Sequence, residues 1–181
     1  MDLRAGLVEE VIPTERIQRL LDPQFVAQLD SRSLDDLRAM KDQCVDVENA
    51  LSYLRRLAQA RVEILDAERD RRARGGSVGD LVKDLPRILS GESGRSTVVD
   101  TRVPPPDAPK LELHWADGRE QMVEDTTLAN LPLIPDAELA DTLERLGVFE
   151  RELSETRHEL HAVIDTLERE IAARQVAGTA G

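Results

Sequence analysis

Apolar residues recur in alternating steps of three and four along two long stretches of the chain. The seam positions of the first stretch are Leu37, Met40, Cys44, Val47, Leu51, Leu54, Ala58, Arg61 and Leu65. Those of the second are Leu139, Leu143, Leu146, Glu150, Leu153, Arg157, Leu160, Ile164, Leu167 and Ile171. This spacing is typical of coiled-coil helices, which bury a narrow seam against a partner helix.

The pattern divides the chain into a short helical N-terminal segment, a first long helix, a connector, a second long helix and a flexible tail. These segments are residues 1–30, 33–74, 75–135, 136–175 and 176–181. Ser33 followed by Asp36 resembles a capping box at the start of the first helix, and Gly75 ends that helix. Asp136 is the expected N-cap of the second helix.

The connector is rich in glycine and proline, and we expect it to be only partly ordered. Four apolar residues predict one short amphipathic helix in it: Leu81, Leu85, Ile88 and Leu89. Residues 110–125 alternate apolar and polar side chains around Asp117 and Gly118. Because Asp-Gly is a turn signal, this stretch predicts a small β-hairpin.

Composition favours a linear core over a globular one. Aromatic residues make up only 2% of the 181 residues, whereas apolar residues make up 40% and charged residues 33%. Since the connector is long enough for the second helix to fold back, we predict an all-α fold, a long antiparallel coiled-coil hairpin within one chain. Pairing of the helices between two chains, as a homodimer, is the competing arrangement.

Each long helix also carries one spaced set of polar residues. The first set is Glu48, Ser52, Arg55, Gln59 and Glu63; the second is Glu150, Ser154, Arg157, His161 and Asp165. Their common spacing returns to nearly one helix face, so each set forms a stripe about 22 Å long. A single charged seam residue often only fixes the register of a coiled coil, but that role does not explain the same stripe twice.

The residue types in the stripes suit guanine. An arginine fits the O6 and N7 acceptors of guanine with two hydrogen bonds. A carboxylate accepts hydrogen bonds from guanine N1 and N2, and serine or glutamine reaches phosphate or ribose oxygens. Two facing stripes would therefore suit a two-fold symmetric ligand with two guanines, and cyclic di-GMP is such a ligand.

The order of residues in both stripes resembles the cyclic di-GMP signature of the RsiG family of anti-sigma factors, which carry one copy on each helix of an antiparallel coiled coil. Glu63 stands where that signature has aspartate, and His161 stands where it has glutamine. The resemblance covers the two helices but neither the N-terminal segment nor the connector.

The resemblance implies a regulator that sequesters WhiG, a flagellar-type sigma factor that controls sporulation in filamentous actinobacteria. Cyclic di-GMP would lie between the two proteins, bound by the ten stripe residues. The net charge of −12 fits this arrangement, because an anionic ligand is disfavoured on an acidic protein unless a basic partner closes over it.

Other function classes have little support in the sequence. The acidic charge argues against direct nucleic-acid binding. No apolar run approaches the length of a membrane span or resembles a signal peptide, so we expect a cytoplasmic protein. Cys44 is the single cysteine, and no metal-ligand cluster, phosphate loop or catalytic arrangement appears, so we expect no metal and no enzyme. The alternative function is a ligand-independent coiled-coil adaptor or oligomerisation protein.

Overall fold

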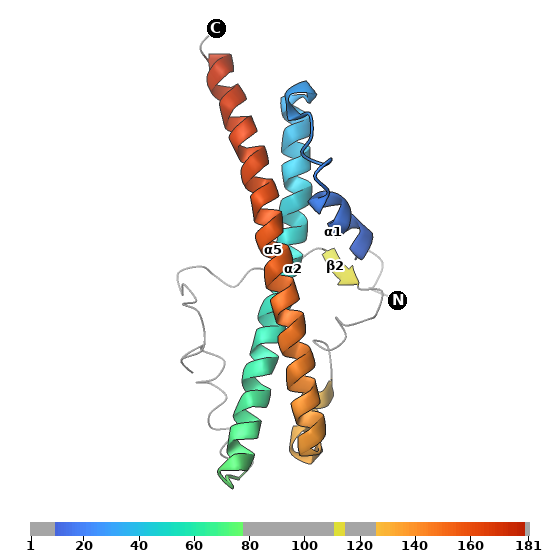
Figure 1. Cartoon of the computed structure of the whole chain (residues 1–181), viewed down its shortest axis with the longest axis vertical. Coiled ribbons are helices and arrows are strands. Elements are labelled where there is room, and N and C mark those ends of the chain that lie inside the picture. Colours follow the sequence, from blue (N-terminus) through green and yellow to red (C-terminus); the bar gives the residue numbers. More distant parts are fainter. Residues whose placement is uncertain (1–9, 78–110, 115–125, 180–181) are drawn as a thin grey trace, which may run out of the picture. The chain divides into compact units, whose positions relative to one another are not determined.

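A computed structural model describes residues 10–77, 111–114 and 126–179 of the chain (Figure 1). Its elements, in chain order, are β1 (Glu10–Pro13), α1 (Thr14–Leu21), the 3-10 helix η1 (Leu29–Ser31), α2 (Leu34–Ala73), β2 (Leu111–His114), the 3-10 helix η2 (Thr126–Leu133) and α5 (Asp136–Thr179). The helix α5 continues four residues beyond its predicted end, so residues 176–179 are helical and not a frayed tail.

The ends of α2 follow from local sequence. The Ser33 hydroxyl accepts a hydrogen bond from the Asp36 amide at 3.1 Å, and the Ser33 amide donates to the Asp36 carboxylate at 3.2 Å. These two bonds are the predicted capping box. At the other end Gly75 has a φ of 66°, and its amide donates to the Arg72 carbonyl at 3.0 Å. Together with the bond from the Gly76 amide to the Arg71 carbonyl at 2.9 Å, this forms a Schellman motif.

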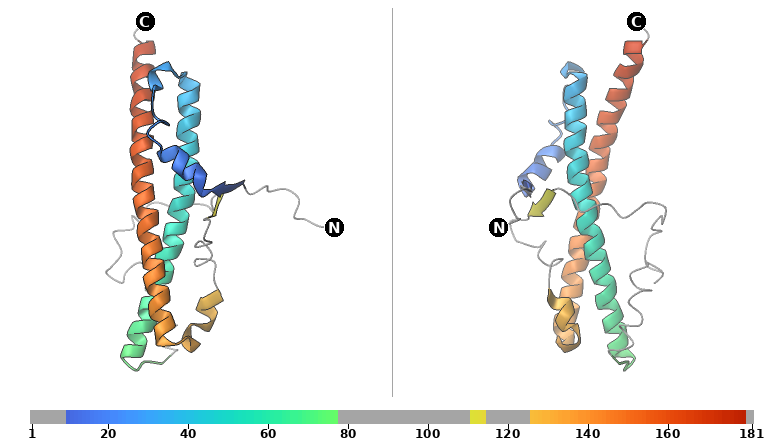
Figure 2. Two further views of the ribbon diagram at one scale, coloured as in Figure 1. Left: turned by 45° about the vertical axis from the view of Figure 1, so that its right-hand side comes forward. Right: turned by 180° about the vertical axis from the view of Figure 1, so that it is seen from behind.

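The chain forms two compact units, and both long helices contribute to each. Unit 1 consists of Met1–Tyr53, Asp107–Gly118 and Leu153–Gly181, and unit 2 of Leu54–Pro106 and Arg119–Glu152. Within each unit a segment of α2 lies beside a segment of α5 (Figures 1 and 2).

Ion pairs across the helices show the direction of packing. In unit 1 Lys41 pairs with Glu168 and Glu48 pairs with Arg157. In unit 2 Arg55 pairs with Glu150 and Arg72 pairs with Asp136. In both units a residue nearer the C-terminal end of α2 pairs with a residue nearer the N-terminal end of α5. The predicted antiparallel hairpin within one chain is therefore confirmed.

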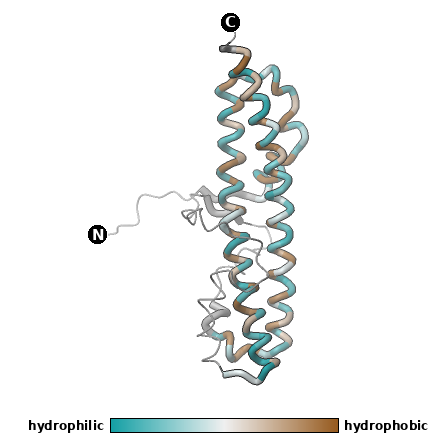
Figure 3. Tube along the Cα trace, turned by 90° about the vertical axis from the view of Figure 1, so that its left-hand side faces the viewer, coloured by the Kyte–Doolittle hydropathy of each residue, from teal (hydrophilic) through white to brown (hydrophobic). Residues whose placement is uncertain are grey.

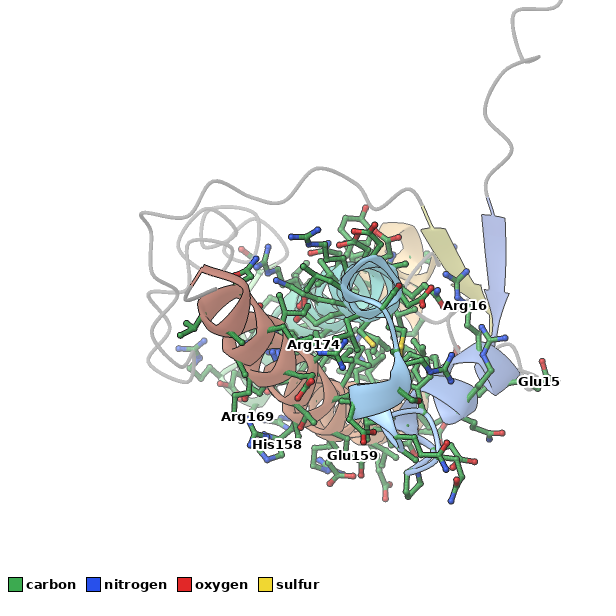
Figure 4. All side chains as sticks on the ribbon, turned by 90° about the horizontal axis from the view of Figure 1, so that it is seen from above. Glu15, Arg16, His158, Glu159, Arg169 and Arg174 are labelled. Atoms are coloured by element: carbon green, nitrogen blue, oxygen red, sulfur yellow. The ribbon has the colours of Figure 1, made fainter. Side chains whose placement is uncertain are left out.

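The core of unit 1 is the predicted seam with α1 added. Its buried apolar residues are Ile17, Leu20, Leu37, Met40, Cys44, Val47, Ala50, Leu51, Leu153, Leu160, Ile164 and Leu167. Along both long helices such apolar positions alternate with polar ones (Figure 3). The Arg174 guanidinium of α5, labelled in Figure 4, also donates to the backbone carbonyls of Leu29 and Arg32 and so holds the end of the N-terminal segment.

The core of unit 2 is closed by charged residues. Leu65, Leu131, Leu139 and Leu146 form its apolar cluster. Glu68 lies three residues after Leu65, at the next seam position of α2, and has no exposed surface. Its carboxylate accepts hydrogen bonds from Arg71 at 2.6 and 2.7 Å and from Arg72 at 2.7 Å.

Arg72 links this buried carboxylate to the segment that precedes α5. Its guanidinium donates to the carbonyls of Leu131 and Ile134, both at 2.8 Å, and to the Asp136 carboxylate at 2.6 Å. The charged stretch after Leu65 therefore forms part of the packed end of unit 2.

The two strands form a pairing that the sequence did not predict. The helix α1 confirms the short N-terminal helix, but β1 was not predicted. The strand β2 falls in the predicted hairpin, yet it pairs in parallel with β1, with Glu10 opposite Leu111 and Pro13 opposite His114. A two-stranded hairpin alone is only marginally stable in water. In the structure β2 gains its pairing from β1, which lies about a hundred residues earlier in the chain. Residues 115–125 and the predicted helix at residues 81–89 lie outside the described part of the chain.

Candidate functional site

Most of the predicted stripe residues meet in two polar clusters, one in each unit. The Glu48 cluster, in unit 1, consists of Glu48, Ser52, Arg157 and His161. The Arg55 cluster, in unit 2, consists of Arg55, Gln59 and Glu150. Both occupy the boundary between α2 and α5, where the seam of α5 has a charged residue in place of leucine.

One carboxylate oxygen organises the Glu48 cluster. Glu48 Oε1 accepts hydrogen bonds from Ser52 Oγ at 2.8 Å and from Arg157 Nε and Nη2 at 3.0 and 2.8 Å. His161 Nε2 lies 3.2 Å from the same oxygen. The Glu48 side chain is 15% exposed, and Ser52 is buried. The charged groups of this cluster are therefore largely removed from water.

These donors keep Glu48 ionised. Burial alone would raise the pKa of the Glu48 carboxyl, because a desolvated charge is unfavourable. The hydrogen bond from Ser52, the hydrogen bond and charge of Arg157 and the charge of a protonated His161 outweigh burial, so the pKa is lowered overall. The cluster thus presents a carboxylate that accepts N–H and O–H donors at neutral pH.

The Arg55 cluster satisfies its arginine less completely. Arg55 Nη1 donates to Gln59 Oε1 at 3.1 Å and to Glu150 Oε1 at 3.3 Å. Arg55 Nε is buried and has no hydrogen-bond partner. A guanidinium carries five N–H donors, and a buried donor without a partner is costly. This arginine therefore has donor capacity that an acceptor such as guanine O6 or N7 would use.

Both clusters join the two stripes by crossed pairs. In unit 1 the arginine of the second stripe, Arg157, meets the glutamate of the first, Glu48. In unit 2 the arginine of the first stripe, Arg55, meets the glutamate of the second, Glu150. Each cluster therefore contains one arginine and one glutamate, whose donors and acceptors are complementary to two edges of a guanine base.

The three remaining predicted residues lie on the same two helices. Ser154 is half-buried on α5, and Asp165 is exposed. Glu63 is half-buried on α2, and burial raises the pKa of its carboxyl.

One polar pair of unit 1 was not predicted from the sequence. Lys41 Nζ lies 2.7 Å from Glu168 Oε1. Lys41 lies seven residues before Glu48, and Glu168 lies seven residues after His161. This heptad spacing, applied outward from both stripes, is the signal that would have found the pair.

In the part of the chain that the structure describes, no three histidine, cysteine, aspartate or glutamate side chains gather as a metal site would require. Within those same residues, no helix has both the length and the apolar character needed to cross a bilayer.

Comparison with known proteins supports one family. A family model described as RsiG-like matches residues 23–89 and 125–181, more than half of the chain. The matched segments include α2, α5 and all residues of both stripes, but not β1, α1 or β2. None of the curated proteins compared with the chain matches it.

Proposed function

This chain belongs to the RsiG-like family, and we propose that it is an anti-sigma factor that cyclic di-GMP activates. In this proposal the nucleotide binds the two polar stripes. The chain then sequesters a WhiG-type sigma factor and so represses sporulation genes. The family is of a regulatory, anti-sigma type and is not a family of enzymes. Its kind of partner is a sigma factor.

The crossed arginine–glutamate pairs carry this proposal. In each cluster the arginine and the glutamate now satisfy each other. Guanine offers acceptors to an arginine on one edge and donors to a carboxylate on another. One guanine bound at a cluster would replace the protein ion pair of that cluster with contacts from the arginine and the glutamate to the base.

The charge of the chain supports a shared site. Cyclic di-GMP brings two phosphate charges to a protein of net charge −12. Basic residues of the sigma factor would offset this repulsion by closing over the ligand. In such a site nucleotide and sigma factor bind cooperatively, and each raises the affinity of the other by the same factor.

Capture of the sigma factor with and without nucleotide tests the proposal. The wild-type chain should retain a WhiG-type sigma factor strongly only with cyclic di-GMP. Cyclic di-AMP should fail, because adenine lacks the O6 acceptor and the N1 and N2 donors of guanine. The double variant Arg55→Ala, Arg157→Ala should lose nucleotide-dependent capture, since each bidentate arginine contributes about 1–3 kcal/mol.

The matched control is Arg56→Ala, Arg151→Ala, which removes one exposed arginine from each of the same helices. It should capture the sigma factor like the wild type, and both double variants should keep the helical circular dichroism spectrum. The proposal would be contradicted if the double variant Arg55→Ala, Arg157→Ala still captured the sigma factor in a nucleotide-dependent way.

The alternative, a ligand-independent adaptor or oligomerisation protein, rests on the same contacts. Because Glu48 and Arg157 already satisfy each other, their pair would also stabilise a hairpin that binds no nucleotide. An adaptor would retain its partner equally with and without cyclic di-GMP.

A further inference from the structure

The fourth position of the two stripes makes different contacts in the two units. In the Arg55 cluster Gln59 accepts a hydrogen bond from the arginine of its own stripe at 3.1 Å. In the Glu48 cluster His161 instead faces the glutamate of the other stripe, with Nε2 3.2 Å from Glu48 Oε1. The first stripe thus has the uncharged amide of Gln59 at this position, whereas the second has the imidazole ring of His161, a side chain type that can change charge within the physiological pH range.

Charged groups of both helices lie near His161. From α2 it faces Glu48, whose side chain is only 15% exposed, so that carboxylate is poorly screened by water. On α5, Arg157 lies one turn before it and the exposed Asp165 one turn after it. Lys41 of α2 is paired with Glu168. The His161 side chain itself is 50% exposed and therefore exchanges protons with solvent.

Ligand binding would add negative charge near His161. If a guanine takes over the contacts between Arg157 and Glu48, the anionic phosphates join a region that already holds Glu48 and Asp165. A protonated ring offsets that charge and offers two N–H donors, whereas a neutral ring offers one. The bound state should therefore hold more protons than the free state, and affinity should fall as pH rises.

We propose that His161 makes cyclic di-GMP binding proton-coupled, so that the Glu48 cluster takes the nucleotide more tightly in mildly acidic than in mildly alkaline solution. This inference rests on the proposed function. It assigns a pH-responsive role to the position at which this chain departs from the glutamine of the first stripe.

The test is a titration of fluorescently labelled cyclic di-GMP into the complex of the full chain with a WhiG-type sigma factor, at about pH 6, 7 and 8. Uptake of one proton limits the change in wild-type affinity to about tenfold per pH unit. We expect a loss of several-fold between the two ends of the range. His161→Gln should remove the dependence, and His161→Lys, with a constant positive charge, should bind with a flat profile near the wild-type acidic value.

His158→Gln is the matched control. His158 lies on the same helix, is exposed and points away from α2 (Figure 4). This variant should keep the wild-type slope. Calorimetry in two buffers of different ionisation enthalpy should show proton uptake by the wild type that His161→Gln lacks.

A wild-type affinity that is equal across the range, or a slope that survives in His161→Gln, would overturn this inference and leave the proposed function standing. Absence of nucleotide binding at every pH would overturn both.

Discussion

Arg157 donates two hydrogen bonds, at 3.0 and 2.8 Å, to a single carboxylate oxygen of Glu48. The two residues lie on α5 and α2, 109 positions apart in the chain. Each belongs to a different copy of the polar stripe. The pair therefore joins two helices in unit 1, and in the proposed function it also holds the donor and the acceptor that a guanine would use.

The Glu48–Arg157 pair should contribute measurably to stability. Its two side chains are 15% and 24% exposed, between the values of a surface pair and a fully buried one. We expect a coupling free energy of about 1–2 kcal/mol in a double-mutant cycle of Glu48→Ala and Arg157→Ala, measured by urea denaturation. Additive single effects would contradict this role.

The buried seam should dominate the stability of unit 1. Leu160 has no exposed surface, so Leu160→Ala should lower the free energy of unfolding by about 2–5 kcal/mol through lost burial and a residual cavity. Leu133 is 83% exposed, and Leu133→Ala should change the same quantity by less than about 0.5 kcal/mol. Similar losses from the two variants would show that Leu160 is not buried as described.

Glu68 should make unit 2 sensitive to acid. The hydrogen bond from Arg71 is the largest cause that lowers the pKa of this carboxyl, and Arg72 adds to it against the opposing effect of burial. A lowered pKa means that the ionised form stabilises the fold above pH about 4.5. That contribution is lost as the pH falls from about 4.5 through the lowered pKa.

Glu68→Gln should therefore lower the melting temperature at neutral pH and flatten its fall in acid. The exposed Glu144, changed to glutamine, is the control and should behave like the wild type in both respects. A Glu68→Gln variant that melts at the wild-type temperature at neutral pH would contradict this role.

Much of the fold could be predicted because its core is one-dimensional. The heptads of Leu37–Leu65 and Leu139–Ile171 locate the seam of each helix, and the Ser33–Asp36 box and Gly75 mark the ends of α2. The pairing of β1 with β2 could not be predicted, because two four-residue strands about a hundred residues apart carry no local turn signal between them.

The candidate site could be predicted in its residue types but not in its contacts. The repeated stripe identifies Glu48, Arg55, Glu150 and Arg157 as members of one pattern. Which arginine meets which glutamate depends on the stagger of α5 along α2, which the packing of the buried leucines fixes. The burial of Glu68 could not be predicted for a related reason. A run of charged residues on a helix usually lies in solvent, and only the residues packed against Glu68 show that it does not.

The most direct test of the account is a calorimetric titration of cyclic di-GMP into the chain alone, into a WhiG-type sigma factor alone and into their equimolar mixture. We expect binding to the mixture at least tenfold tighter than to either protein alone, because the ligand completes a site that both proteins share. Equal affinity for the chain with and without the sigma factor would contradict nucleotide-dependent sequestration, and no heat in any of the three titrations would contradict nucleotide binding itself.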